Sequence, residues 1–334
     1  MEHREDRSRA NSVRSASCPF SYRNSRPGYS GALISLYAGM VAMRNIVAVI
    51  LTLASVCTAT ATQAEGSIAE THRFYEVRGA KVYVQTYGSG TPIVFLHGGI
   101  VFFDNNFSKQ RDYFASFRKV IGIDRRGHGH SPDNQLPFSY HDMAEETAAL
   151  IEQLGVAPVD VVGHSDGGDI GLLLARDHPR LIRRLVISGA NMRVDLDSEE
   201  RQRQGHWTPE QAAEKVRQLN DQLPPSFRTD YEKVAPDGPE HWWTLLYKSH
   251  QMWLASDILQ AADLKKIKVP VLVMAGDHDF TSIEETVEIY RGLEKGQLII
   301  IPGTGHGTMR DRPDLVNLAI REFVERPEAD LGVN

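Results

Sequence analysis

A serine stands between two glycines directly after an apolar run in the stretch DVVGHSDGGD, residues 160–169. Ser165 can act as a nucleophile if a neighbouring base takes its proton. Gly163 and Gly167 lie two positions away on either side, and this G-x-S-x-G spacing is typical of a tight turn from a strand into a helix. The serine at such a turn has a strained backbone, and side chains at the two flanking positions would collide. The motif alone also fits an ordinary glycine-rich turn, so other residues must support the assignment.

Candidates for the base and the orienting acid follow two later apolar runs. VLVMAGDHDF ends in Asp277 and Asp279, and IIIPGTGHG contains His306. A serine nucleophile needs a histidine to accept its proton and a carboxylate to orient that histidine. Because the carboxyl ends of parallel strands meet at one edge of a sheet, we expect Ser165, an aspartate and His306 to converge there. The chain order Ser, Asp, His is the one expected for this architecture.

Short apolar runs and amphipathic stretches alternate from residue 71 onward. Two stretches with period-two alternation, 74–79 and 81–88, predict a hairpin. Continuous apolar runs predict buried strands at 92–98, 119–127, 159–165, 184–190, 269–277 and 297–303. Amphipathic stretches predict helices at 139–155, 167–179, 282–293 and 314–325. The alternation predicts an α/β fold with a mostly parallel central sheet and helices on both faces.

One interval, residues 191–268, contains no convincing strand. It predicts several helices, including 208–223 and 239–255, and it is too long for a simple connection. We therefore expect a helical lid inserted into a core formed by residues 66–190 and 269–330. All four tryptophans fall in this interval: Trp207, Trp242, Trp243 and Trp253. Packing of the lid onto its own helices accounts for some of them, and we expect at least one, with Trp243 as the candidate, to form an aromatic wall over Ser165.

Composition narrows the classes of partner. The 334 residues, 41% of them hydrophobic, are enough for one large or two small domains with a proper core. The net charge is −6 and the folded part has no dense basic patch, so nucleic acid is not an expected partner. Cys18 and Cys57 both precede the folded part, so neither a disulfide framework nor a cysteine metal site is expected. His128 and His130 have no convincing further ligands near them, and we expect no metal and no cofactor.

The first 65 residues differ from the rest. Residues 1–30 are rich in Arg, Ser and Asn and predict a disordered extension. Residues 43–64 resemble a secretory signal, with a short positive region, an apolar stretch and small residues near Ala64, so we expect export to the periplasm or medium after cleavage there. This raises the hypothesis that translation starts at Met40 or Met43. In the alternative, residues 31–61 remain as an uncleaved membrane anchor.

From about residue 72 to 326 the chain resembles the α/β-hydrolase superfamily. The matching motifs, in order, are HGG at 97–99, DRRGHGHS at 124–131, GHSDGG at 163–168, GDHD at 276–279 and GHG at 305–307. The resemblance implies the α/β-hydrolase fold with a helical lid insert. It also implies an acid at the end of G-x-x-D, which is Asp279, and leaves Asp277 as a turn residue. Haloalkane dehalogenases and epoxide hydrolases need a carboxylate where this chain has Ser165, so attack on an acyl carbon is implied instead.

The HGG motif carries a further expected role. Backbone N–H groups aimed at the developing oxyanion stabilise it by about 3–4 kcal/mol per donor. We expect one donor from Asp166, directly after the nucleophile, and the other from Gly99 or its neighbour Ile100, which should also contact substrate. His97 is expected to hold this loop.

Asp166 places an aspartate beside the nucleophile. GHSDGG resembles the branch of the superfamily that contains valacyclovir hydrolase and related amino-acid ester hydrolases, in which this aspartate recognises the substrate ammonium group. The resemblance therefore implies substrate contact by the Asp166 side chain and a cationic substrate. The alternative is that the side chain hydrogen-bonds only to nearby backbone or to the lid.

The sequence thus predicts an exported serine hydrolase that cleaves a small or medium carboxylic ester through an acyl-enzyme intermediate. Ser165, His306 and Asp279 form its expected catalytic triad. Two alternatives remain open. The same triad could act on a lactone, an amide, an aminoacyl ester or a C–C bond, or the protein could be a ligand-binding homologue without catalysis. The expected partner is a small-molecule ester, with membrane contact only if the N-terminal segment stays uncleaved.

Overall fold

The computed structural model describes residues 70–192, 208–255 and 258–327. Every described residue belongs to one compact unit, Glu65–Asn334. The predicted export signal, both cysteines and Trp207 lie outside the described residues. None of the helices in the described part of the chain combines the length and the apolar character needed to cross a membrane.

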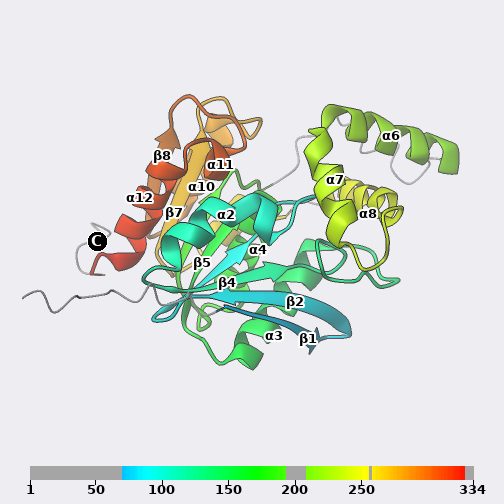
Figure 1. The fold of residues 1–334 in the computed structure, drawn as a ribbon. Coiled ribbons are helices and arrows are strands. Elements are labelled where there is room, and N and C mark those ends of the chain that lie inside the picture. The colour runs from blue at the N-terminus through cyan, green and yellow to red at the C-terminus, as the bar shows by residue number, and fades with distance from the viewer. Residues whose placement is uncertain (1–69, 193–207, 256–257, 328–334) are drawn as a thin grey trace, which may run out of the picture. The chain divides into compact units, whose positions relative to one another are not determined.

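The centre of the fold is a sheet of eight strands in the order β1-β2-β4-β3-β5-β6-β7-β8 (Figure 1). The strands are β1 (Glu70–Val77), β2 (Ala80–Tyr87), β3 (Pro92–Leu96), β4 (Lys119–Asp124), β5 (Val159–His164), β6 (Ile182–Ser188), β7 (Val271–Gly276) and β8 (Gly296–Ile301). β1 and β2 form the predicted antiparallel hairpin, and β2 pairs antiparallel with β4. All other pairs are parallel, which confirms the mostly parallel sheet.

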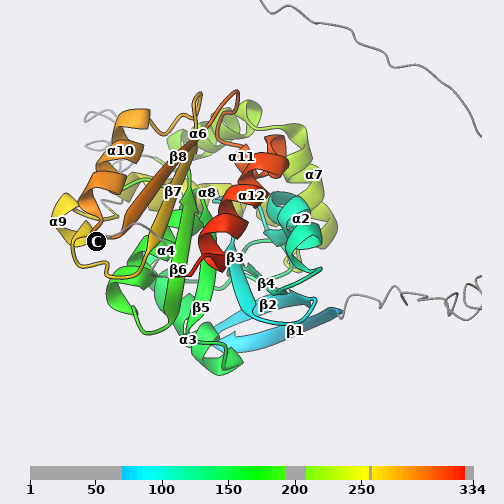
Figure 2. The same cartoon turned by 90° about the vertical axis from the view of Figure 1, so that its left-hand side faces the viewer.

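Helices cover both faces of the sheet because side chains alternate along each strand. From β3, Val94 and Leu96 enter one core cluster, which includes residues of α3 (Tyr140–Leu154), α4 (Asp166–Asp177) and α10 (Ile283–Gly292). Ile93 and Phe95 enter the other cluster, with residues of α2 (Phe103–Phe114), α11 (Thr308–Asp311) and α12 (Pro313–Glu325). Figure 2 shows α2 and α12 on the opposite side of the strands from α4 and α10.

The sequence did not predict α2. Its first cap position is Phe102, which has no side-chain acceptor for the helix N–H groups, and Phe107 in its middle has non-helical backbone angles (φ −125°). A helix with neither a capping residue nor an uninterrupted period gives a weak local signal. Buried Phe103, Phe107 and Phe114 hold it against the sheet instead.

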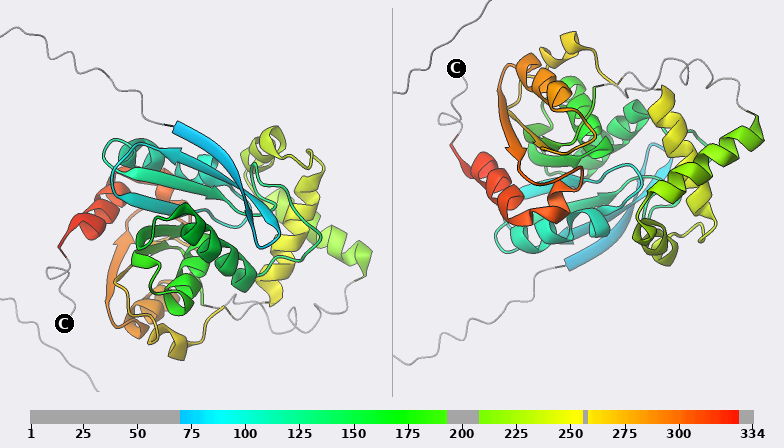
Figure 3. Two further views of the ribbon diagram at one scale, coloured as in Figure 1. Left: turned by 90° about the horizontal axis from the view of Figure 1, so that it is seen from below. Right: turned by 90° about the horizontal axis from the view of Figure 1, so that it is seen from above.

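Between β6 and β7 the described residues form helices and their connecting loops, without a strand. The helices are α6 (Pro209–Gln222), α7 (Pro225–Val234), α8 (His241–Ala255) and α9 (Ala261–Leu264). The two helices predicted from the sequence correspond to α6 and α8, and α7 lies between them in the chain. Figure 3 shows α6, α7 and α8 grouped together. Thr208 caps α6 by accepting a hydrogen bond from the Gln211 backbone, and Pro209 follows at a position where its missing N–H costs nothing.

Candidate active site at the carboxyl ends of the strands

Ser165 lies at a strained turn between β5 and α4. Its backbone angles are φ +53° and ψ −125°, in a region that side-chain-bearing residues rarely adopt. A Cβ on Gly163 would lie 2.2 Å from the Gly167 carbonyl oxygen, and one on Gly167 would lie 1.9 Å from the Leu96 carbonyl oxygen. Only glycine fits at either position, so this is the turn that the G-x-S-x-G spacing predicts.

His306 pairs with Asp279 and not with Asp277. Asp279 follows β7, its side chain is fully buried, and its Oδ1 lies 2.8 Å from His306 Nδ1. Asp277 instead accepts a hydrogen bond from the Thr304 backbone N–H at 3.1 Å, as a turn residue does. The Asp279 carboxylate can therefore fix the Nδ1–H tautomer of His306 and leave Nε2 free to accept a proton.

Ser165 and His306 line the same cavity, which has a volume of about 350 Å³. Its apolar walls come from the loop after β3, from the segment between β6 and β7, and from α11: Ile100, Val101, Leu219, Leu223, Phe227, Trp253 and Met309. The Phe280 ring is tilted by 31° against the His306 ring, with centroids 4.0 Å apart. Asp279 lies behind His306, so the structure brings the three predicted catalytic residues together at one edge of the sheet.

Gly99 and Asp166 are the residues whose backbone N–H groups are expected to bind the oxyanion. The N–H of Gly98 donates to Asn106 Oδ1 at 2.9 Å. By contrast, the N–H groups of Gly99 and Asp166 donate to no residue within the described ranges. Gly99 lines the cavity, and a Cβ on it would lie 2.6 Å from Trp253 Cζ2 and 2.7 Å from Asp166 Oδ2. Glycine is thus required here because an indole packs against the backbone.

The Asp166 side chain is buried and does not line the cavity. Its Oδ1 accepts a hydrogen bond from the Tyr140 hydroxyl at 2.9 Å, and Trp253 Nε1–H lies 3.1 Å from both carboxylate oxygens. These contacts agree with the alternative hypothesis, in which the Asp166 side chain hydrogen-bonds to the segment between β6 and β7. Both carboxylate oxygens have a hydrogen-bond donor within the protein.

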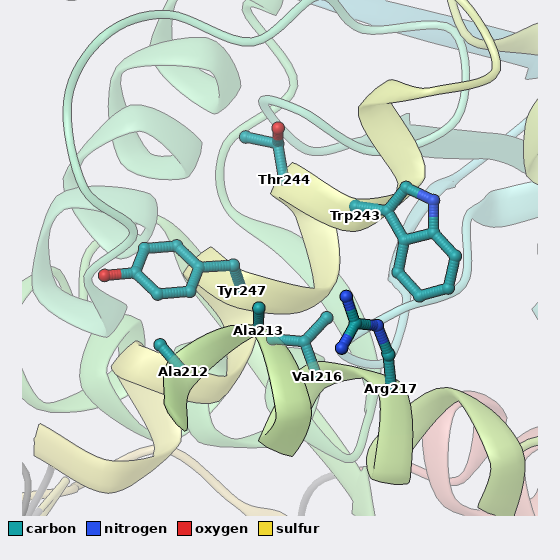
Figure 4. Close-up of a pocket in the computed structure, with 7 residues that line it drawn as sticks. All are labelled: Ala212, Ala213, Val216, Arg217, Trp243, Thr244 and Tyr247. Atoms are coloured by element: carbon teal, nitrogen blue, oxygen red, sulfur yellow. The ribbon is translucent and has the colours of Figure 1, made fainter. Parts of the chain in front are cut away.

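Trp253, rather than the predicted Trp243, lies over the nucleophile. Trp243 lines a different hollow between α6 and α8, together with Ala213, Val216 and Tyr247 (Figure 4). That hollow is larger, about 740 Å³, but its described lining contains no histidine, aspartate or glutamate that could activate a hydroxyl group. Ile100, the other predicted substrate contact, does line the cavity of Ser165.

His164 and Asn106 connect the loop after β3 with the loop that carries His306. His164 Nε2 lies 2.7 Å from the backbone oxygen of His306, and His164 Nδ1 lies 3.2 Å from Asn106 Nδ2. Burial, reinforced by the nearby His306, lowers the pKa of His164 to about 3. The His164 ring is therefore neutral at physiological pH and has a single proton to donate.

The remaining polar residues of the predicted motifs fix loops. His97 is fully buried, burial holds its pKa well below the usual range, and its Nε2 accepts the Arg125 N–H at 3.0 Å. Asp124 accepts from the Phe103 N–H and from His130, each within 3 Å. Arg126 pairs with Glu146 at 3.0 Å. Within the described ranges no three His, Cys, Asp or Glu side chains gather as a metal site would require.

The cavity residues that were not predicted from the sequence include Asn105, Asn106, Phe280 and Arg310. Phe280 directly follows Asp279, so its place in the chain could have predicted that it lies at the cavity. The other three lie on α2 and α11, two helices that the sequence did not predict.

Comparison with known proteins is consistent with this geometry. The model of the alpha/beta hydrolase family matches residues 93–319. An (E)-2-((N-methylformamido)methylene)succinate hydrolase of Acinetobacter baylyi is 25% identical, over 71% of this chain and 92% of its own. A bifunctional esterase/perhydrolase of Acinetobacter calcoaceticus is 26% identical, over 74% of this chain and 96% of its own. The crystal structure of a serine hydrolase involved in carbazole degradation superposes with a TM-score of 0.63 at 22% identity, covering 77% of this chain and 99% of that one.

Proposed function

Because this chain belongs to the alpha/beta hydrolase family, we propose that it is a serine hydrolase that cleaves small to medium carboxylic esters through an acyl-enzyme intermediate. The observation that carries the proposal is the contact of Asp279 with His306 at 2.8 Å, in a site where His306 and Ser165 face one cavity. This is the arrangement that a serine needs to become nucleophilic.

The proposed reaction has two halves. Ser165 Oγ attacks the ester carbonyl carbon while His306 Nε2 takes the hydroxyl proton, and Asp279 stabilises the resulting imidazolium. The N–H groups of Gly99 and Asp166 stabilise the oxyanion until the C–O bond to the alcohol breaks and His306 protonates the leaving oxygen. Water then loses a proton to His306 and attacks the acyl carbon. The bond between that carbon and Ser165 Oγ breaks, His306 returns the proton to Oγ, and the carboxylic acid leaves.

The cavity supports the substrate size. A volume of about 350 Å³ is at the small end of the range of roughly 300–1,000 Å³ that ligand sites occupy. Its mostly apolar walls suit a hydrocarbon group on either side of the ester. The esterase/perhydrolase relative of Acinetobacter calcoaceticus, whose name includes an esterase activity, supports an ester as the bond cleaved.

Active-site labelling together with turnover of para-nitrophenyl butyrate tests the proposal. Ser165→Ala should abolish both fluorophosphonate labelling and turnover, because no other hydroxyl replaces Oγ. Asp279→Asn should lower kcat by about 10⁴-fold, since the amide favours the wrong histidine tautomer. Asp277→Asn is the matched control and should retain activity.

Two outcomes would count against the proposal. Turnover that survives Ser165→Ala would exclude Ser165 as the nucleophile. A wild-type protein that neither reacts with the fluorophosphonate nor hydrolyses the ester would favour a ligand-binding protein without catalysis.

A further inference from the structure

Among the described residues, one side chain that lines the cavity of Ser165 is fully charged. Arg310, on α11, contributes that charge. The described lining residues include no Asp or Glu, and their basic side chains are those of Arg310 and two histidines, of which His164 is neutral. The nearest catalytic carboxylate, Asp279, is fully buried behind His306, and Asp166 is covered by Trp253 and Tyr140. Within the described residues, a bound substrate therefore meets one positive charge in the cavity wall; the carboxylate that pairs with it, that of Asp311, does not line the cavity.

The guanidinium of Arg310 is only partly engaged. Its Nε donates to Asp311 Oδ1 at 3.1 Å, and both side chains are about half exposed, at 58% and 41%. The two terminal nitrogens donate to no residue in the described part of the chain. A Cβ built on Gly307 would lie 2.7 Å from Arg310 Nη2, so one of these nitrogens lies against the backbone next to His306.

The chemistry of this arrangement favours an anion. A guanidinium presents parallel N–H groups that match the two oxygens of a carboxylate, and such charge-assisted pairs are stronger than neutral hydrogen bonds. The other walls of the cavity, including Leu219, Phe227 and Trp253, offer an apolar surface and no competing acceptor charge. One substrate with a hydrocarbon part and an anionic end would satisfy both surfaces.

We propose that the ester substrate carries a carboxylate and that the terminal nitrogens of Arg310 bind it beside the reacting carbonyl. The inference rests on the proposed ester hydrolysis and narrows it to a substrate class. The carboxylate can belong to the acyl part or to the alcohol part of the ester, and a separate pair of substrates tests each of these two positions.

Matched pairs of substrates test the proposal on the full-length protein. For the acyl part, the para-nitrophenyl monoester of glutaric acid is compared with para-nitrophenyl valerate, which has the same chain length but ends in methyl. For the alcohol part, para-acetoxybenzoate is compared with para-cresyl acetate. The measured quantity is the ratio of kcat/KM for the anionic ester to kcat/KM for its neutral partner, in the wild type and in Arg310→Lys, Arg310→Gln and Arg310→Glu.

We expect the ratio for one pair to fall about fivefold in Arg310→Gln, the effect of a half-exposed ion pair. The fall should be larger in Arg310→Glu, because a like charge repels the substrate, and smaller in Arg310→Lys, because the charge remains. Arg312→Gln and Arg312→Glu are the controls. Arg312 lies two residues away, pairs with Asp314 and is absent from the cavity lining, so both ratios should match the wild type.

The pair whose ratio changes identifies the part of the ester that carries the carboxylate. Neutral esters that are hydrolysed normally, with ratios that do not respond to Arg310 or that respond equally to Arg312, would overturn the anion proposal and leave ester hydrolysis standing. A wild-type protein that neither reacts with the fluorophosphonate nor hydrolyses any of the esters would overturn both the ester-hydrolase proposal and the anion proposal.

Discussion

At the scale of single residues, the proton of His164 determines how two loops are joined. A carbonyl oxygen can only accept, so the contact with the His306 backbone at 2.7 Å places the single proton of neutral His164 on Nε2. Nδ1 must then accept, and Asn106 Nδ2 is the donor within reach at 3.2 Å. This orientation turns Asn106 Oδ1 toward the Gly98 N–H, which it meets at 2.9 Å. Every hydrogen bond from the Gly98 backbone to that of His306 thus has one donor and one acceptor.

Asn106→Asp should disrupt one hydrogen bond between Gly98 and His306, the one from residue 106 to His164 Nδ1. The carboxylate can still accept from Gly98, but it cannot donate to His164 Nδ1, and its negative charge favours a proton there. We expect the pKa of His164 to rise from about 3 and kcat to fall by about tenfold, the effect of one disrupted hydrogen bond. Histidine NMR titration and the pH profile of kcat measure the two effects. A His164 signal that remains without titration above pH 5 would contradict the assignment.

At the scale of elements, one tryptophan connects α8 to the start of α4. Trp253 packs its ring over Gly99 and donates to the Asp166 carboxylate, so the loop after β3, the turn at Ser165 and α8 meet at one indole. Other contacts hold the same segment farther from the cavity, such as Lys248 with Asp133 at 2.6 Å. The position of Trp253 over Ser165 therefore depends on the buried hydrogen bond from its indole N–H to the Asp166 carboxylate.

Trp253→Phe should destabilise the protein by about 1.5–3 kcal/mol, the range for hydrogen bonds to charged groups. The substitution keeps the aromatic ring but removes the donor, so the buried Asp166 carboxylate retains only Tyr140 as a side-chain donor among the contacts above. Trp243→Phe is the matched control, because the indole N–H of Trp243 has no acceptor among the described residues. Chemical denaturation of both variants measures the difference. Equal losses would mean that the Trp253 bond contributes nothing beyond its ring.

At the scale of the whole molecule, the sheet and its two layers of helices bury several histidines as neutral groups. Burial lowers the pKa of His128 and of His164 to about 3. The unfolded chain binds protons at these residues near pH 6.5, while the folded chain does not. The folded state therefore binds fewer protons, and its stability must decrease as the pH falls from about 6.5 toward 3.

Each of these two histidines should contribute up to about 1.4 kcal/mol of lost stability per pH unit in this window. His128→Gln should therefore reduce the slope of the unfolding free energy against pH between pH 6.5 and 5, whatever its effect on absolute stability. His278→Gln is the control, since the side chain of His278 is 78% exposed. Urea denaturation at several pH values measures the slopes. Identical slopes in wild type and His128→Gln would show that His128 titrates alike in both states.

Local sequence patterns were sufficient to predict the strands and the turn that form the backbone of the site. All six continuous apolar runs are strands of the sheet, and Gly163, Ser165 and Gly167 form the strained turn, because hydrophobic period and glycine requirements are properties of neighbouring residues. The loop after β3, with its closely packed Gly99, was also identifiable for this reason. The same dependence on local signals explains why α2, without a capping side chain and with a non-helical Phe107, was missed.

The tertiary structure decided which side chains meet. Trp243 and Trp253 lie on the same helix, and only the packing of α8 shows that Trp253 covers the nucleophile while Trp243 faces α6. Asp166 and Trp253 are 87 residues apart, and His164 and His306 are 142 apart. Contacts at such separations depend on how helices pack on the sheet, and no local period encodes them. The same is true of Arg310, whose position at the cavity follows from the packing of α11 against α2 and not from any motif around it.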